Sequence, residues 1–204
     1  MISKTYRVLL LATTLAGAAV QARAGNIVSD PGFESGVPSD YPGPMGDGWI
    51  VTAGTGAICN NNHTGCGNAG FAHTGSQMGY LDWDSSLNTI TQDLTTVIGH
   101  TYTISYWVAD EKANFLQVTF GGTTLFNGAA PTNGVNPSNY VQYTFMSTAT
   151  STSTVLAFTG QRTAGGNGTL LDDVSVAPGA VPEPATWVLT SAALLALRAF
   201  RRLQ

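Results

Sequence analysis

Two tight acidic pairs in the middle of the chain have the residue types that could cleave a glycosidic bond. That reaction needs two positioned carboxyl groups, one acting as an acid and the other as a base or nucleophile. Asp82 and Asp84 flank Trp83 and would share one face of a strand, whereas the neighbours Asp110 and Glu111 would point to opposite faces. Both pairs also fit strand ends, where carboxylates solvate turns. We therefore predict no enzyme and keep a polysaccharide hydrolase using Asp82 and Asp84 as the weaker alternative.

Other catalytic patterns find little support in the sequence. No Gly-x-Ser-x-Gly segment accompanies the serines, histidines and aspartates, so a nucleophilic triad is unsupported. His63, His73 and His100 are scattered and lack the close spacing of zinc ligands. We interpret these histidines as surface or turn residues.

Aromatic side chains are the stronger candidates for function, because sugar rings stack on Trp and Tyr while sugar hydroxyls bond to polar neighbours. Trp83 lies between Asp82 and Asp84, Trp107 lies in an alternating segment, and Tyr41 lies in a Pro-rich loop. Core packing is the alternative fate of each tryptophan. These five residues are the predicted carbohydrate-binding set.

The elements that must position these side chains are strands. In the segment 100–108, Tyr102, Ile104, Tyr106 and Val108 alternate with polar residues, which is the pattern of a half-buried strand. Further alternating runs cover 77–83, 87–95, 114–120, 123–126, 140–147, 153–160 and 169–176. Many short strands without an amphipathic helix predict an all-β fold, an antiparallel β-sandwich of the jelly-roll type, over residues 25–177.

Composition and charge limit the classes of molecule that the chain is expected to bind. Between Gly25 and Ala180 the only bases are Lys112 and Arg162, against eleven acidic residues, so this part carries 2 − 11 = −9 although the whole chain carries −4. Nucleic acid is excluded as a partner, because phosphate binding needs clustered bases.

The two cysteines, Cys59 and Cys66, enclose a short polar loop. In an exported chain they predict a disulfide that stabilises the domain by roughly 2–3 kcal/mol. A metal site that also uses His63 is the alternative, although a fourth ligand is not obvious.

Residues 1–24 have the pattern of a secretory signal peptide. Lys4 and Arg7 precede an apolar stretch over 8–20, and the small residues Ala22 and Ala24 form a signal-peptidase pattern. We expect a signal helix that is removed between Ala24 and Gly25.

The C-terminal tail, 178–204, combines a stiff collar, an apolar stretch and a basic end. The collar is Val181-Pro182-Glu183-Pro184, residues 185–197 are apolar, and Arg198, Arg201 and Arg202 follow. The stretch is shorter than the roughly 20 residues of a comfortable membrane helix. The basic end would stay inside, which leaves the preceding chain outside the inner membrane.

This tail resembles the PEP-CTERM sorting signal, which routes exported bacterial proteins to an exosortase. The resemblance implies a short hydrophobic helix that anchors the protein in the inner membrane before processing, followed by residence at the cell surface or in the extracellular matrix. A plain membrane anchor is the alternative. Exosortase is therefore an expected partner.

Two further motifs bracket the predicted sandwich. The opening segment 26–36 with Gly48-Trp49, and the closing strand 170–176, resemble those of carbohydrate-binding-module-like jelly rolls of the galactose-binding-domain type. The resemblance implies that Trp49 is a core residue. It also implies one structural calcium ion held by Glu34 and by Asp172 or Asp173. Alternation places Asp172 on the inner face, and the alternative to calcium is that Asp172 accepts backbone amide bonds at a sheet edge.

Together these features predict an exported, non-enzymatic β-sandwich that binds exopolysaccharide or another matrix glycan. The rival hypothesis is a structural or adhesive matrix protein without a ligand.

Overall fold

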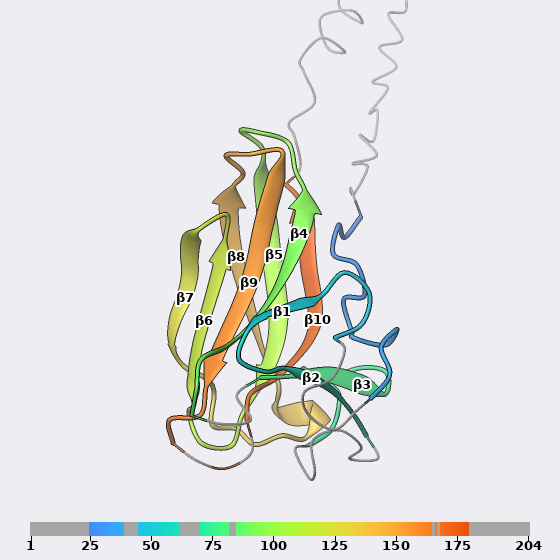
Figure 1. The fold of residues 1–204 in the computed structure, drawn as a ribbon, viewed down its shortest axis with the longest axis vertical. Helices are drawn as coiled ribbons and strands as arrows, with labels where there is room; N and C mark the ends of the chain where they lie inside the picture. Colours follow the sequence, from blue (N-terminus) through green and yellow to red (C-terminus); the bar gives the residue numbers. More distant parts are fainter. Residues whose placement is uncertain are drawn as a thin grey trace, which may run out of the picture.

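The computed structural model describes residues 25–38, 45–61, 70–81, 85–164, 166 and 168–179. Within them, ten strands form two antiparallel five-stranded sheets that pack face to face (Figure 1). Sheet A has the order β1-β4-β9-β6-β7 and sheet B the order β2-β3-β10-β5-β8. The elements are β1 (Ile50–Ala53), β2 (Ala57–Asn60), β3 (Gln77–Tyr80), β4 (Asn88–Thr95), β5 (Thr101–Ala109), β6 (Phe115–Phe120), β7 (Thr123–Ala129), the short 3-10 helix η1 (Pro137–Asn139), β8 (Val141–Thr148), β9 (Ser153–Gln161) and β10 (Leu170–Pro178).

Alternating side chains place the main core between the sheets, as the sequence predicts. On β5, Tyr102, Ile104, Tyr106 and Val108 are buried, and the residues between them are not, apart from the end of the strand. The same alternation buries every second residue of β4, β6 and β9, among them Ile90, Val118 and Phe158. This arrangement confirms the predicted antiparallel β-sandwich.

The N-terminal segment closes one side of this core. Phe33 is fully buried and stacks on Trp49 with 5.3 Å between ring centroids, and Trp49 is only 5% exposed, which confirms its assignment to the core. The Phe33 ring lies directly over Gly79, where a Cβ would come within 2.9 Å of it. Only glycine therefore fits at this point of β3.

The opening and closing motifs lie side by side. Ile27 donates its backbone N–H to the carbonyl of Val176 at 2.9 Å. The Asn26 side chain bonds to the carbonyl of Val174 at 2.9 Å and accepts from the N–H of Val176 at 2.8 Å. These bonds explain why two motifs about 140 residues apart in the chain belong to one structural unit.

Two features differ from the expectations. The alternation pattern did not predict strands β1 and β2, because each has four residues and glycines interrupt the segment between them. Asp172 does not face inward with Val174, because the pairing of β10 with β5 shifts between Asp172 and Ser175, and Asp173 adopts a positive φ of 46°. This β-bulge adds a residue and turns Asp172 to the outer face.

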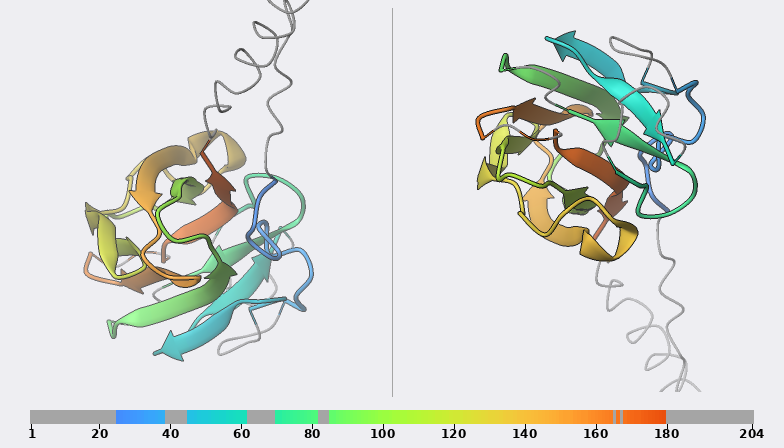
Figure 2. Two further views of the ribbon diagram at one scale, coloured as in Figure 1. Left: turned by 90° about the horizontal axis from the view of Figure 1, so that it is seen from above. Right: turned by 90° about the horizontal axis from the view of Figure 1, so that it is seen from below.

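Several predictions fall on residues outside the described ranges. They concern the signal peptide 1–24, the tail 180–204 and the residues Tyr41, His63, Cys66, Asp82, Trp83 and Asp84. No helix among the described residues is long and apolar enough to cross a membrane. Figure 2 shows the sandwich from its two ends, which we call the upper end and the lower end after their places in Figure 1.

Candidate functional site

A second apolar cluster lies on the outer face of sheet B, at the lower end. Its strand residues Cys59, Met78, Tyr80, Ala109 and Leu170 alternate with residues of the main core, so they point away from sheet A. Loop residues complete this outer cluster; they are Ala72 and Tyr140, with the partly buried Trp107 and Val135 packed against it. Two loops, 70–76 and 130–140, thus cover part of the outer face.

Trp107 and His73 form the centre of the candidate site. The imidazole of His73 stacks on the indole of Trp107, with 4.0 Å between centroids and 19° between ring planes. The ring centroid of Tyr140 lies 5.4 Å from that of His73, and the Tyr140 hydroxyl donates to the carbonyl of Phe71 at 2.9 Å. Burial, and then the charges of Asp172 and Asp173, raise the pKa of Tyr140, so the hydroxyl keeps its proton and its role as a donor.

Asp172 holds the backbone of the loop that carries His73. It is fully buried, and its Oδ2 accepts the backbone N–H groups of His73 at 2.8 Å and Thr74 at 3.2 Å, while its Oδ1 accepts the N–H of Asp173 at 2.7 Å. Burial, and then the nearby charge of Asp173, raise the pKa of Asp172 to about 7 although the three amide bonds favour the ionised form. The carboxyl group therefore fixes the loop that carries His73.

Asp173 holds the same loop through side chains. Its Oδ2 lies 2.6 Å from Nδ1 of His73, and its Oδ1 accepts the hydroxyl of Thr74 at 2.7 Å. Which of these two atoms donates depends on the tautomer of His73. The bulge at Asp172 and Asp173 lets two consecutive carboxyl groups reach one loop, which regular alternation would forbid.

The three predicted calcium ligands meet, but their oxygen atoms are occupied by protein donors. A Cβ on Gly32 would lie 3.5 Å from Asp172 Oδ1, 3.7 Å from Glu34 Cγ and 3.9 Å from Asp173 Oδ1. Glu34 accepts the N–H groups of Ser76 and Gln77 at 2.7 and 2.8 Å and the Ser76 hydroxyl at 2.9 Å.

Calcium requires six to eight oxygen ligands. Among the described residues, no group of three or more His, Cys, Asp or Glu side chains is placed to hold a metal ion. Asp172 accepts backbone amides, as in the alternative to calcium, but it lies on β10, an inner strand of sheet B, and not at a sheet edge. Calcium binding stays a prediction.

A polar strip without charge runs from Trp107 across the outer face. Trp107 pairs with Gln142 on β8, and the next outward row pairs Ser105 with Thr144. Gln142 and Thr144 are exposed, and Ser105 is half-buried. A half-buried indole beside hydroxyl and amide groups has the composition that sugar rings require: an apolar face and fixed hydrogen-bonding groups.

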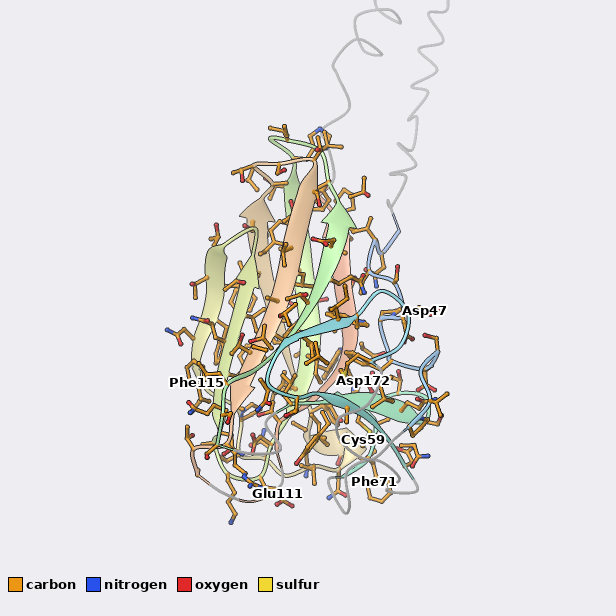
Figure 3. All side chains as sticks on the ribbon, in the orientation of Figure 1. Asp47, Cys59, Phe71, Glu111, Phe115 and Asp172 are labelled. Carbon is orange, nitrogen blue, oxygen red and sulfur yellow. The ribbon has the colours of Figure 1, made fainter. Side chains whose placement is uncertain are left out.

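Asp110, of the acidic pair Asp110 and Glu111, has a structural role. Asp110 is fully buried and accepts from the N–H of Lys112 at 2.8 Å, the Asn114 amide at 3.2 Å and the Thr169 hydroxyl at 2.7 Å. Burial raises the pKa of Asp110, and these bonds oppose that rise. Asp110 joins loops at the lower end, where Figure 3 also places Glu111.

Of the sequence-predicted binding residues, Trp107 lies in this site, whereas Tyr41, Asp82, Trp83 and Asp84 lie outside the described ranges. Cys59 is buried in the outer cluster and is not a free cysteine, and its pairing with Cys66 stays a prediction. Sequence reasoning missed Tyr140 and treated His73 as a surface or turn residue. No local signal marks either of them, because their partners are distant in the chain.

Comparisons with known proteins bear on the fold. No family model matches the sequence, and no curated protein is similar to it in sequence. A Stig cyclase from Fischerella sp. TAU has a similar structure, with a TM-score of 0.53 at 12% identity over 79% of this chain and 100% of the cyclase. An arabinose-bound α-L-arabinofuranosidase, MgGH51, has a TM-score of 0.51 at 13% identity, over 78% of this chain and 27% of that enzyme. The CBM22-1 xylan-binding domain of Paenibacillus barcinonensis Xyn10C has a TM-score of 0.48 at 19% identity, over 79% of this chain and 99% of that domain.

At these identities the similarity concerns the fold alone. A jelly-roll β-sandwich is therefore established for the described residues. Because one fold can host many unrelated functions, function must be argued from the side chains of the site.

Proposed function

We propose that the mature chain is an exported, non-enzymatic module that binds an uncharged exopolysaccharide or other matrix glycan on the outer face of sheet B. The observation that carries this proposal is the Trp107–His73 stack at the edge of a polar, uncharged strip. A sugar ring that contacts this stack would place its hydroxyl groups near Gln142 and Thr144 on one side and near Asp173 on the other.

The site is held in place before any ligand arrives, which favours binding because less conformational freedom is lost. Asp172 and Asp173 fix both the backbone and the ring of His73 through bonds of 2.6 to 3.2 Å. The stack remains accessible, since 20% of the His73 side chain and 30% of the Asp173 side chain are exposed.

Charge favours an uncharged ligand. An acidic polysaccharide would meet a domain with eleven acidic residues and two bases, Lys112 and Arg162. Neither base belongs to the polar strip. An uncharged glycan avoids this repulsion and needs only stacking and hydrogen bonds.

We further propose that the chain reaches the cell envelope or matrix through its termini, as a secreted substrate of an exosortase. The support is the pattern of residues 1–24 and the collar, apolar stretch and arginines of the tail. Intact-mass analysis of the exported protein tests this step. Removal of residues 1–24 is expected, and a mass that retains them would contradict it.

Affinity electrophoresis tests the binding site. The mature chain is run through gels that contain one polysaccharide each, including the exopolysaccharide of the producing cells. Gln142→Ala is the informative variant, because Gln142 is exposed and its loss leaves the core intact. Gln117→Ala is the matched control, because Gln117 lies on the outer face of sheet A.

We expect one glycan to retard the protein, with at least tenfold weaker binding for Trp107→Ala, a change of about 1.4 kcal/mol. Gln142→Ala should weaken binding to a smaller extent and Gln117→Ala should not. Retardation that none of these substitutions changes would contradict the site. No retardation by any glycan would favour the rival hypothesis, a structural matrix protein.

A further inference from the structure

The upper end of the sandwich carries two exposed aliphatic side chains on a rigid turn. Val97 and Ile98, between β4 and β5, are 52% and 61% exposed. The N–H of His100 bonds to the carbonyl of Val97 at 3.1 Å, and Gly99 has a φ of 81°. This combination is the pattern of a type II turn, in which glycine at the third position permits the positive φ and Ile98 lies at the tip.

Neighbouring groups fix the turn in this position. The N–H of Gly99 bonds to the carbonyl of Ala149 at 2.8 Å, and Ala149 bonds back to His100 at 2.9 Å. The hydroxyl of Tyr102 accepts the N–H of Val97 at 2.9 Å. Exposure of the two side chains is therefore built into the fold.

The C-terminal end of the described chain lies against this turn. Gly179, directly after β10, donates its N–H to the carbonyl of Thr101 at 2.8 Å, one residue beyond His100. Figure 1 shows β10 ending at the same end of the sandwich as the β4–β5 and β8–β9 turns. The apolar stretch of the tail begins at Ala185, six residues after Gly179. Even a fully extended chain of this length spans only about 20 Å.

The turns at the upper end contain none of the acidic groups that dominate the domain. The segments 25–27, 96–101, 121–123, 148–153 and 177–179 contain no Asp, Glu, Lys or Arg. The acidic residue of sheet A at this end, Asp93, lies on β4, two residues before Thr95. Asp110, Asp172 and Asp173 lie at the lower end. An anionic bilayer surface repels acidic groups, so it would orient the domain with its uncharged end toward the lipid.

From these observations we infer that the Val97–Ile98 turn docks on the lipid bilayer. The inference rests on the proposed membrane anchoring through residues 185–197. The short connection brings the upper end to the headgroup layer, and the two aliphatic side chains enter it. The lower end, with the Trp107 site, then points away from the membrane toward the matrix.

Depth-dependent quenching tests the docking. The mature chain is reconstituted into vesicles of phosphatidylethanolamine and phosphatidylglycerol at a ratio of 3:1, with a doxyl-labelled lipid as quencher. Ile98→Cys carries a bimane label, and Leu87→Cys is the matched control, because Leu87 is an exposed aliphatic residue next to the opposite end of β4. The unsubstituted chain, oxidised throughout, reports any labelling of the native cysteines.

We expect at least threefold stronger quenching of the label at residue 98 than at residue 87. Flotation of the vesicles reports anchoring separately. A chain that floats with equal or no quenching at the two positions would overturn docking and leave the anchor intact, as would be seen if a protein partner covered the turn instead. A chain that does not float would overturn the anchor and the docking together.

Discussion

The two ends of the sandwich differ in how the chain closes them. At the upper end, short turns bond to one another through backbone groups, and no Asp, Glu, Lys or Arg lies within them. At the lower end, longer loops are held by the buried carboxyl groups of Asp110 and Asp172. Figure 3 shows Asp172, Cys59, Phe71 and Glu111 together in the lower half of the molecule.

One fold can thus give its two ends different properties. Turns held by backbone bonds and by hydroxyl groups such as that of Tyr102 need no charged side chain for their stability, so the upper end can expose aliphatic residues. Carboxyl groups that accept several N–H bonds fix irregular loops, so the lower end can position a ring such as His73 over Trp107. If this is correct, the stability of the lower end depends on its carboxyl groups.

The largest effect is expected for Asp110→Ala. This change removes the acceptor of three hydrogen bonds, from the Lys112 N–H, the Asn114 amide and the Thr169 hydroxyl, and the loss of one such bond costs about 1 kcal/mol. The free energy of unfolding should fall by about 3 kcal/mol in urea titration. Asp93→Ala is the control, because Asp93 is exposed, and it should change stability by less than about 0.5 kcal/mol. Equal effects of the two variants would refute the structural role of Asp110.

The next largest effect on the free energy of unfolding is expected for loss of the predicted disulfide. Opening the short loop that Cys59 and Cys66 enclose should lower the free energy of unfolding by about 2.5 kcal/mol in the chain-entropy model. Titration of the unfolded, unreduced protein with a thiol reagent should find no free thiol. Two reactive thiols would show that this part of the lower end is held without a covalent bond.

The pH dependence of stability follows from Asp172. Because its pKa rises from 3.8 to about 7, the folded protein binds a proton more tightly than the unfolded chain between these values. The contribution of Asp172 is therefore fully present below the unfolded pKa and is lost as the pH rises to about 7. The raised pKa of Asp110 acts in the same direction.

We expect the free energy of unfolding to fall by about 2 kcal/mol between pH 5 and pH 8. Asp172→Asn should lower stability overall and reduce this slope, whereas Asp93→Asn should preserve it. A profile that rises over the same range would show that other groups, and not the buried carboxyl groups, dominate.

The smallest effect is expected for removal of divalent cations. Protein donors already bond to the carboxylates of Glu34, Asp172 and Asp173, so the loops are held without an ion and a chelator should change the melting midpoint little. Differential scanning calorimetry with added calcium and with chelator measures this directly. A midpoint that rises clearly with calcium would mean that the carboxylates rearrange around an ion.

Much of the fold could be predicted from the sequence because burial on one face imposes a period of two. That signal identified β5 from Tyr102 to Val108, and it identified the other long strands. It failed for β1 and β2, which are too short to show a period. It also misplaced Asp172, because a bulge depends on the backbone conformation of a single residue, Asp173.

The site was predictable only in part. Trp107 stands out as an aromatic residue on the polar side of an alternating strand. Its partner His73 is 34 positions away and bonds to Asp173, 100 positions further on. Contacts at such separations leave no trace in local composition, so the stack became visible only in the folded chain.

Hydrogen–deuterium exchange of the mature chain, with and without the glycan that retards it most, tests where the glycan binds. The account predicts slower exchange in the segments 70–76 and 141–145, which surround Trp107 and His73, and unchanged exchange in the turn 96–100 at the upper end. Slower exchange confined to sheet A or to the upper end, or no glycan that alters exchange anywhere, would contradict it.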